Sequence, residues 1–457
     1  TPSAVELQEA CAIQLLGLDP SVDSSISCHC QCPFDLQDLE VVIEDDQRKP
    51  DIAVQLGLEC FEPETINTEK IPNYIQRIAE ENSILINQNP VKFIPSKNII
   101  FHNHALPNHP NTLTFIAFQD ENIVLEGTYY SVGGGFIQKE GESQSAKRKV
   151  ILPFPIDKGE DLLKHCQNTG FSVSELVKMN ELHFRSWEEI EKGVDSIFET
   201  MSECAFKGAN TGGILPGGLN VKRRAKNLDE QLLNGSKFET KEAWLDAIKN
   251  APKDFNKINN RISCFALAVN EQNAALGRVV TSPTNGAAGV IPAVLLYYYC
   301  FCENRGMKDI RRFLFAAGEI GCLFKKGATI SAAVGGCQAE IGVSSAMAAG
   351  GLTEVLGGTP RQVLMAAEIA MEHHLGLTCD PIGGLVQIPC IERNTMGAMK
   401  AITASNLALS GNPEDAVVNF DVVVKTMWET AQEMNGKYKE TSEGGLAINL
   451  PVYMPDC

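Results

Sequence analysis

The chain has 457 residues, of which 44% are hydrophobic and 21% charged, proportions typical of a soluble globular protein. A chain of this length exceeds one ordinary hydrophobic core, so we expect two or three domains. The formal net charge of −18 argues against a nucleic-acid partner, because phosphate binding needs clustered lysine and arginine side chains.

The chain begins at Thr1 rather than at a methionine, which we interpret as a processed chain or a fragment. Residues 1–18 contain acidic residues and lack the basic start of a secretory signal peptide. The run from Cys28 to Cys32 includes Cys30 and His29, a combination that predicts either a small metal site or an irregular loop. We favour the loop, because no second group of metal ligands is evident.

The first 150 residues predict a mixed α+β domain. Alternating and β-branched segments indicate strands, and one amphipathic segment indicates a helix. The expected strands are Leu39–Ile43, Ile99–Phe101, Leu113–Ala117 and Ile123–Tyr130, and the expected helix is Ile71–Ala79.

Three consecutive glycines, Gly133–Gly135, follow the last of these strands. Glycine adopts backbone conformations closed to other residues and lets the backbone approach a ligand closely. Ser131 and Gly134 are therefore candidates for substrate binding, with a simple tight turn as the alternative interpretation.

After a polar linker at residues 138–148, the pattern becomes helical. We expect helices at Asp161–Gln167, at Ser172–Glu203 with Ser172 as the N-cap, at Thr240–Phe255 and in long windows from Arg261 onward. The sequence thus predicts a multidomain fold: an α+β domain over residues 1–150 followed by an all-α domain over residues 151–457.

Val279–Cys302 carries no charged residue, a length that could cross a bilayer. Pro283, Asn285 and Pro292 interrupt it, so we predict a loop followed by a buried helix and no membrane association. The chain also holds 15 cysteines. In an acidic chain without a signal peptide, they indicate a reducing compartment such as the cytoplasm, with a metal or catalytic role for a few of them.

Three cysteines lie in turns rich in glycine and proline. Cys337 follows two glycines, Cys379 lies two residues before Pro381, and Cys390 directly follows a proline. Such turns let a bulky iron–sulfur cluster approach, with backbone N–H groups pointing at its sulfides. Three thiolates would leave one iron of a [4Fe–4S] cluster open as a Lewis acid. From spacing alone we favour three buried structural cysteines, since no C-x-x-C pair is present.

The residues around the cysteines favour a cluster site over three structural cysteines. Gly335–Gly342 reads GGCQAEIG, Glu372–Pro381 reads EHHLGLTCDP, and Gln387–Asn394 reads QIPCIERN. These segments resemble the catalytic domain of single-chain, iron–sulfur-dependent L-serine dehydratases. The resemblance is close over residues 155–457 and moderate over residues 95–136.

The resemblance implies a [4Fe–4S] cluster held by Cys337, Cys379 and Cys390, and no pyridoxal phosphate. It implies that the terminal Cys457 occupies the fourth iron until substrate displaces it. It also implies an effector-binding N-terminal module, a homodimer, and conversion of L-serine to pyruvate and ammonia in amino-acid catabolism and gluconeogenesis.

The segment Thr284–Gly289 (TNGAAG) belongs to the same resemblance. Thr284, Asn285 and Gly286 are candidates to donate hydrogen bonds to the substrate. The alternative is that they cap the apolar helix that follows them.

The general base is where the chain departs from the family pattern. The family carries one histidine in an S-S-S-H-T loop and another in a G-K-G-H-G-T-D loop. The first loop is absent here, and Arg48 stands where the second histidine is expected, although Asp51 matches. Arginine stays protonated near neutral pH and cannot act as a base. His29, the only histidine before residue 100, is a weak replacement candidate.

Dehydration of serine needs a base for the Cα proton and an electrophile for the leaving hydroxyl. An active L-serine dehydratase is therefore our first hypothesis. A non-catalytic cluster protein or serine-sensing regulator is the second. A lyase for another β-substituted amino acid, such as threonine or cysteine, is the third.

Overall fold

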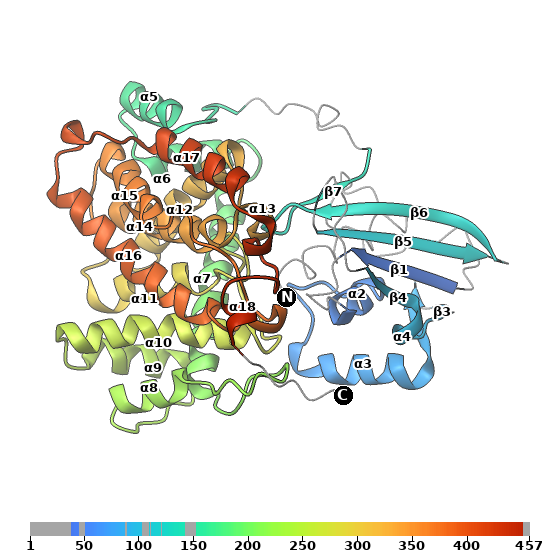
Figure 1. Ribbon diagram of the computed structural model, residues 1–457. Coiled ribbons are helices and arrows are strands. Elements are labelled where there is room, and N and C mark those ends of the chain that lie inside the picture. Colours follow the sequence, from blue (N-terminus) through green and yellow to red (C-terminus); the bar gives the residue numbers. More distant parts are fainter. Residues whose placement is uncertain are drawn as a thin grey trace. The chain divides into compact units, whose positions relative to one another are not determined.

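The computed structural model describes residues 38–44, 51–86, 89–102, 109, 111–119, 121–141 and 152–450. The chain divides into two compact units, Thr1–Arg148 and Lys149–Cys457. Figure 1 shows a sheet with helices in the first unit and a helical second unit. The predicted fold class, an α+β region followed by an all-α region, is confirmed over the described residues.

The described part of the first unit forms one mixed sheet, in the order β2-β3-β1-β5-β6-β7, with β4 pairing parallel to β1. Its strands are β1 (Asp38–Glu44), β2 (Ser83–Ile86), β3 (Asn89–Lys92), β4 (Ile99–His102), β5 (Thr112–Gln119), β6 (Asn122–Ser131) and β7 (Ile137–Lys139). The four predicted strands correspond to β1, β4, β5 and β6. The remaining three have three or four residues each, too few to establish an alternating pattern.

Helices α2 (Asp51–Leu58) and α3 (Ile71–Glu81) lie on one side of this sheet (Figure 1). Val54 of α2 and Ile78 of α3 are buried against strand residues such as Val41. The short elements η2 (Thr68–Lys70) and α4 (Pro95–Asn98) complete the unit's described helices. The predicted helix Ile71–Ala79 is thus confirmed as α3, whereas α2 was not predicted.

The described part of the second unit consists of helices joined by loops, with two isolated β-bridges, Ile214 to Lys222 and Cys379 to Lys439. Its main helices are α5 (Gly159–Thr169), α6 (Val173–Glu181), α7 (Trp187–Asn210), α8 (Ala225–Leu232), α9 (Lys241–Asn250), α10 (Phe255–Asn273), α11 (Val290–Phe301), α12 (Met307–Gly327), α14 (Val343–Val355), α15 (Pro360–Glu372), α16 (Cys390–Ser410) and α17 (Phe420–Glu433). Shorter helical turns are α13 (Ala332–Gly335), η4 (Gln338–Gly342), η5 (Ile382–Gly384), η6 (Pro413–Asp415), η7 (Gly436–Tyr438) and α18 (Leu446–Asn449).

Two predicted helices were too long. The window Ser172–Glu203 forms two helices, α6 and α7, because Ser186 starts a new one by accepting the Glu189 N–H, and Glu189 caps it in return. Ser172 caps α6 as predicted. The window Thr240–Phe255 ends early as α9, since Pro252 cannot continue a helix.

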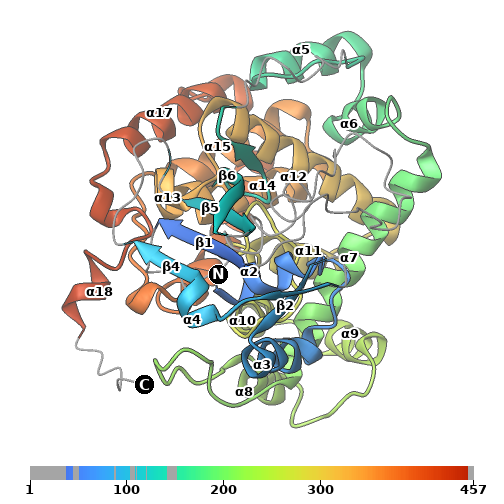
Figure 2. The same ribbon diagram turned by 90° about the vertical axis from the view of Figure 1, so that its right-hand side faces the viewer.

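Helix α14 is the centre of the helical unit, and each of its 13 residues is buried. In Figure 2 it lies between α12 and α15. Small residues permit this close packing: a Cβ on Gly351 would lie 2.9 Å from the backbone oxygen of Phe313. The uncharged stretch Val279–Cys302 contains the buried helix α11, as predicted. None of the described helices has the length and apolar character needed to cross a membrane.

Candidate active site

The three predicted ligand cysteines come from three separate segments of the helical unit. Cys337 joins α13 to the π-helical turn η4, Cys379 follows α15, and Cys390 opens α16. All three are at most 5% exposed. The Sγ atoms of Cys337 and Cys379 and a carboxylate oxygen of Glu340 all lie within 4.8 Å of one another. Cys390 is near enough for the charge of Cys337 to raise its pKa, after the larger effect of burial.

The loops that carry Cys337 and Cys379 pack directly on each other. The backbone N–H of Gln338 donates to the oxygen of Leu377 at 3.0 Å, and its side-chain oxygen accepts the Gly376 N–H at 2.9 Å. Gly336 has a φ of 69°, and a Cβ there would lie 2.9 Å from the Leu377 oxygen. Glycine is therefore required beside Cys337 both for backbone conformation and for space.

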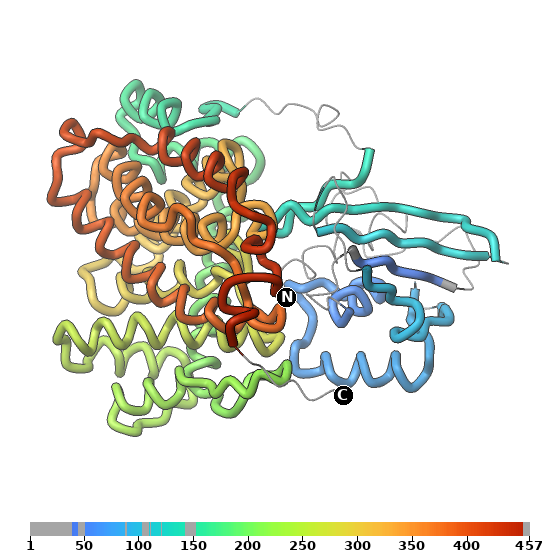
Figure 3. The backbone as a smooth tube through the Cα atoms, in the orientation of Figure 1, coloured from blue at the N-terminus to red at the C-terminus, as the bar shows by residue number. Residues whose placement is uncertain are grey.

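The segment after α17 also holds the Cys379 loop. Cys379 donates its N–H to the oxygen of Tyr438 at 2.7 Å, and its own oxygen accepts the Glu440 N–H at 2.7 Å. Next to it, the Asp380 carboxylate accepts the Leu446 N–H at 2.7 Å, at the start of α18. Figure 3 traces this C-terminal segment in red. The position of Cys379 is therefore fixed from outside its own loop.

Arg393, on the first turn of α16, connects all of these elements. Its guanidinium donates to the Cys337 Sγ at 3.2 Å, to the Thr378 oxygen at 2.6 Å and to the Asp380 carboxylate at 3.0 Å. The hydrogen bond from Cys379, with the charge of Arg393, holds the pKa of Cys337 below its ordinary value despite burial. Cys204, buried without such partners, instead has its pKa raised to about 12. Because the thiolate is the form of cysteine that binds metal, these partners favour the form of Cys337 that a metal site would need.

Sequence reasoning placed Glu340 and Arg393 inside the matching segments and gave neither a role. A signal was available for Glu340, which is the only charged residue between Lys326 and Glu354, whereas Arg393 directly follows Glu392 and does not stand out. A charged residue in a buried segment needs a partner, so it indicates a site.

The predicted substrate-binding loop meets the cysteines through Glu340. Thr284 is buried, and its hydroxyl donates to the Glu340 carboxylate at 2.6 Å. A Cβ on Gly286 would lie 2.9 Å from the same oxygen. Asn285 accepts the hydroxyl of Thr281 instead, at 2.5 Å. The N-cap of α11 is Gly289, without a side-chain cap, so Thr284 does not cap that helix.

Ser131 and Gly134 belong to the first unit. Ser131 ends β6; its side chain is buried and its hydroxyl has no hydrogen-bond partner among the described residues. Gly133, Gly134 and Gly135 all have positive φ, and Val132 donates to the Phe136 oxygen across them. The structure thus contains the tight turn, and substrate binding by Ser131 and Gly134 stays a prediction.

Several residues singled out in the sequence lie outside the described part of the chain: His29, Cys28, Cys30, Cys32, Arg48 and Cys457. In the described part, His374 is buried just after α15, and burial lowers its pKa to about 4. Its Nδ1 donates to the Ala370 oxygen at 2.7 Å. His374 is therefore neutral near pH 7 and serves the structure of the helix end.

Helix α15 carries one further buried carboxyl group, Glu368, one turn before Glu372. Burial, followed by the hydrogen bond to Glu372, raises the pKa of Glu368 to about 8, whereas the ordinary value is 4.5. The contribution of this group to the free energy of unfolding is fully present below about pH 4.5. It is lost as the pH rises through about 8, by on the order of 1 kcal/mol per pH unit.

We therefore expect Glu368→Gln, which stays neutral, to melt at the wild-type temperature near about pH 5 and above it near about pH 9. Thermal denaturation followed by circular dichroism measures this difference. The exposed carboxyl of Glu433, changed to glutamine, is the control and should leave both melting temperatures unchanged. Equal behaviour of the two variants at both pH values would contradict the assignment.

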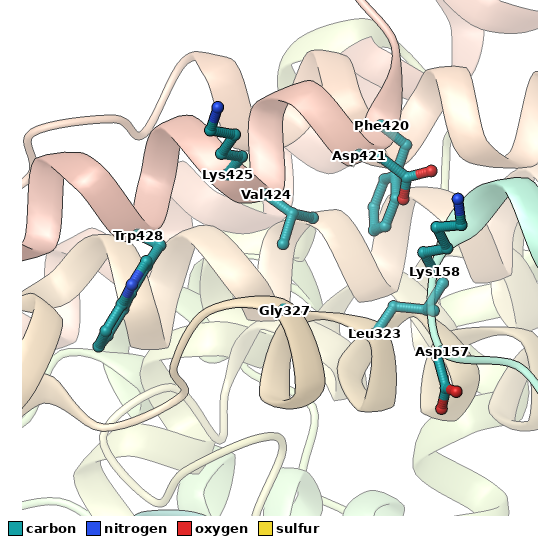
Figure 4. A pocket seen from close by; sticks show the side chains of 9 residues that line it. All are labelled: Asp157, Lys158, Leu323, Gly327, Phe420, Asp421, Val424, Lys425 and Trp428. Atoms are coloured by element: carbon teal, nitrogen blue, oxygen red, sulfur yellow. The ribbon is translucent and has the colours of Figure 1, made fainter.

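A surface pocket also lies beside α17 (Figure 4). It is lined by Asp157, Lys158, Leu323, Gly327, Phe420, Asp421, Val424, Lys425 and Trp428. The Asp421 carboxylate accepts the backbone N–H groups of Gly159 and Glu160 and so caps α5. Lys158 is paired with Glu160 at 2.6 Å. The pocket shares no residue with the cysteine site.

Fold and site define a protein of two units whose helical unit holds a buried cluster of thiols, a carboxylate and a guanidinium. Two family models match the chain: "Serine dehydratase alpha chain" over residues 168–447 and "Serine dehydratase beta chain" over residues 45–142. The chain belongs to the serine dehydratase family.

Curated relatives agree with these matches. The chain is 45% identical over 403 residues to L-serine dehydratase 1 of Escherichia coli K12, covering 88% of this chain and 86% of the relative. It is 46% identical over 405 residues to the L-serine dehydratase of Streptomyces coelicolor, covering 87% of this chain and 85% of the relative. It is 45% identical over 381 residues to the L-serine dehydratase of Helicobacter pylori, covering 81% of this chain and 80% of the relative.

Proposed function

We propose that this protein is an L-serine ammonia-lyase that converts L-serine to pyruvate and ammonia with a [4Fe–4S] cluster on Cys337, Cys379 and Cys390. The observation that carries the proposal is the meeting of Cys337 and Cys379 beside Arg393 and Glu340, in a chain whose relatives are named L-serine dehydratase. Cys390 is the third proposed ligand and is the first residue of the helix that also carries Arg393.

The donor set fits such a cluster. Thiolates are the ligands that iron–sulfur clusters prefer, and their potentials depend on nearby charge, hydrogen bonds and burial. Here the thiols are buried, the Arg393 guanidinium offsets negative charge, and glycines such as Gly336 leave space. When bound, the cluster supplies a Lewis-acidic iron that stabilises the departing hydroxyl oxygen of the substrate.

The chain's own residues supply the remaining functions. Burial of the site excludes water, which strengthens every electrostatic interaction within it. The loop Thr284–Gly286 and Glu340 face the substrate, and a base removes the Cα proton, a role for which His29 stays the sequence candidate. The aminoacrylate product then reacts with one water to give pyruvate and ammonia. We further propose Cys457 as a displaceable fourth ligand, Ser131 and Gly134 as substrate contacts, and a cytoplasmic homodimer.

The proposal is tested by purifying the protein without oxygen, measuring bound iron and sulfide, and following pyruvate formed from L-serine. We expect turnover of L-serine that exceeds that of L-threonine and L-cysteine, and no inhibition by hydroxylamine, which attacks pyridoxal phosphate. A loaded protein that binds L-serine and forms no pyruvate would instead fit the regulator hypothesis. Inhibition by hydroxylamine would contradict the proposal that the enzyme works without pyridoxal phosphate.

Arg393 gives a sharper test of the cluster itself. Arg393→Lys is expected to lose its cluster in air several-fold faster than the wild type, because lysine cannot make the three hydrogen bonds of the planar guanidinium at once. Decay of the visible absorbance after exposure to air measures this rate. Arg361→Lys, at an exposed ion pair with Glu414, is the matched control and should decay at the wild-type rate. Equal rates for all three proteins would contradict the role of Arg393.

A further inference from the structure

Buried polar atoms without a hydrogen-bond partner gather in one part of the helical unit. Among the described residues, eight buried side-chain nitrogen or oxygen atoms lack such a partner, and four of the eight belong to Arg223, Asn270, Gln387 and Glu392. Buried polar atoms are almost always hydrogen-bonded in folded proteins, so each exception needs an explanation. The chain itself leaves the hydrogen-bonding capacity of these four side chains partly unused.

Two of these residues are brought together by the end of helix α10. Arg223 lies in the loop at residues 211–224, between α7 and α8. The backbone N–H of the next residue, Arg224, donates to the Glu271 carboxylate at 2.6 Å. Glu271 directly follows Asn270 on α10, so Arg223 and Asn270 each adjoin one partner of this hydrogen bond.

The same loop also contacts the segment that carries the third cysteine. The Arg224 guanidinium pairs with the Glu392 carboxylate, on the first turn of α16, at 2.8 Å. Gln387 donates its Nε2 to the backbone oxygen of Pro216 at 2.6 Å. Gln387 lies three residues before Cys390, about one helical turn away. The loop therefore joins the unpartnered atoms to the neighbourhood of a proposed cluster ligand.

Gln387 presents a buried acceptor. It is only 2% exposed, and its Oε1 is the atom without a partner. The orientation of the amide is fixed, because the Pro216 oxygen can only accept a hydrogen bond and so must face Nε2. Oε1 is then directed away from Pro216, where it can accept a hydrogen bond from a ligand that carries an N–H group.

Arg223 presents a positive charge. Its Nη1 is buried without a partner, and burial lowers the pKa of Arg223 against the opposing charge of Glu271. The two Glu271 oxygens already accept the backbone N–H groups of Arg224 and Ala225. An arginine stays protonated in proteins, and its planar guanidinium matches a carboxylate with two parallel hydrogen bonds. Arg223 is therefore suited to bind the carboxylate of a ligand.

An α-amino acid carries a carboxylate and an ammonium group on the same carbon, so it matches both residues at once. We propose that Arg223 binds the α-carboxylate group of the substrate, while Gln387 Oε1 accepts a hydrogen bond from its α-ammonium group. The hydroxyl of L-serine, one carbon further along, then turns toward Cys390 and the cluster. This inference rests on the proposed function and adds the residues that recognise the amino-acid part of the substrate.

The experiment uses three ligands that differ in their charged groups. L-Serine has both groups, 2-aminoethanol lacks the carboxylate and 3-hydroxypropanoate lacks the ammonium group. KM and kcat are measured for L-serine and inhibition constants for the other two, on cluster-loaded wild type, Arg223→Gln, Arg223→Lys, Gln387→Leu and Gln387→Asn. Calorimetric binding of L-alanine, which has no hydroxyl to lose, gives a readout independent of turnover.

The control is Arg361→Lys, at an exposed ion pair with Glu414, which should match the wild type with every ligand. Iron and sulfide are measured in each protein, so that loss of the cluster is distinguished from loss of substrate binding.

We expect Arg223→Gln to weaken L-serine and 3-hydroxypropanoate about 10- to 100-fold, the range of a hydrogen bond between charged groups. Binding of 2-aminoethanol should change by less than about threefold. Arg223→Lys keeps the charge without the planar pair of donors, so it should show the same pattern at a smaller size. Gln387→Leu should show the opposite selectivity, with L-serine and 2-aminoethanol weakened about 10-fold and 3-hydroxypropanoate by less than about threefold.

Equal weakening of all three ligands in Arg223→Gln would overturn the inference, because a purely structural role acts on every ligand alike. Unchanged affinities would overturn it too. If Arg223→Gln loses its cluster or fails to fold, Arg223→Lys decides: selective weakening of the two carboxylate ligands supports the inference, and any other pattern overturns it. Gln387→Asn decides in the same way for Gln387, with the two ammonium ligands.

The failure of the proposed function would look different. If the loaded wild type binds L-alanine and forms no pyruvate from L-serine, the proposed function fails. The calorimetric comparison of wild type and variants with L-alanine, 2-aminoethanol and 3-hydroxypropanoate then still tests Arg223 and Gln387.

Discussion

The Cys337→Ser variant is expected to retain less than about a tenth of the wild-type iron and to lose pyruvate formation by at least about 10³-fold. A serine hydroxyl stays protonated at neutral pH and is a poor ligand for a sulfide cluster. Cys337 is chosen for this test because both Cys379 and Arg393 hydrogen-bond to its sulfur. Iron and sulfide analysis with a pyruvate assay, both without oxygen, measures the two losses.

Two other cysteines serve as controls for the same substitution. Cys322 is exposed on α12, and Cys204 is buried on α7 away from the site. Cys322→Ser should match the wild type in iron content and activity. Cys204→Ser should lose some thermal stability, because a hydroxyl replaces a buried apolar group, and should keep its iron. A Cys337→Ser protein with the full iron content of the wild type would show that Cys337 is not a ligand of the cluster.

The second large effect is on stability. Gly208→Ala is expected to lower the free energy of unfolding by about 3 kcal/mol or more, since the added Cβ would lie 2.2 Å from the backbone oxygen of Ala268. Gly208 is buried near the end of α7, where that helix crosses α10. The Ala268 backbone cannot rotate away from the added methyl group as a side chain would, so α7 and α10 must move apart. Denaturant unfolding followed by circular dichroism measures the change.

Gly193 provides a matched control on the same helix. A Cβ there meets no atom within 4 Å. Gly193→Ala should therefore stabilise the protein by about 0.5–1 kcal/mol, because alanine loses less backbone entropy in a helix than glycine does. If both variants were stabilised, the close contact between α7 and α10 would be wrong.

Local sequence was sufficient for elements with a strong local signal. Ser172 stands before an apolar, periodic run and was correctly predicted to cap α6. Ser186 was overlooked because the helical spacing continues through it, although Ser186 followed three residues later by Glu189 is a local signature of the capping box that the structure contains. Strands β2 and β3 have four residues each, and Pro90 makes the sequence of β3 typical of a loop.

The residues of the candidate site also differ in whether local sequence is sufficient to predict them. The cysteines were predicted to be ligands from their flanking residues, which are local. Glu340 and Arg393 have partners 56 positions away, Thr284 and Cys337 respectively, so only the folded chain reveals these contacts. A charged residue in a small-residue run indicates that a partner exists and does not indicate which one.

The central claim, a serine lyase that works through a three-cysteine cluster, is tested most directly by pyruvate formation at graded iron content. Protein stripped of metal is reconstituted without oxygen with increasing iron and sulfide, and each sample is assayed with L-serine. The claim predicts that the rate rises in proportion to bound iron up to about four irons per chain and is negligible in the stripped protein. A stripped chain as active as the loaded one, or a fully loaded chain that forms no pyruvate, would contradict it.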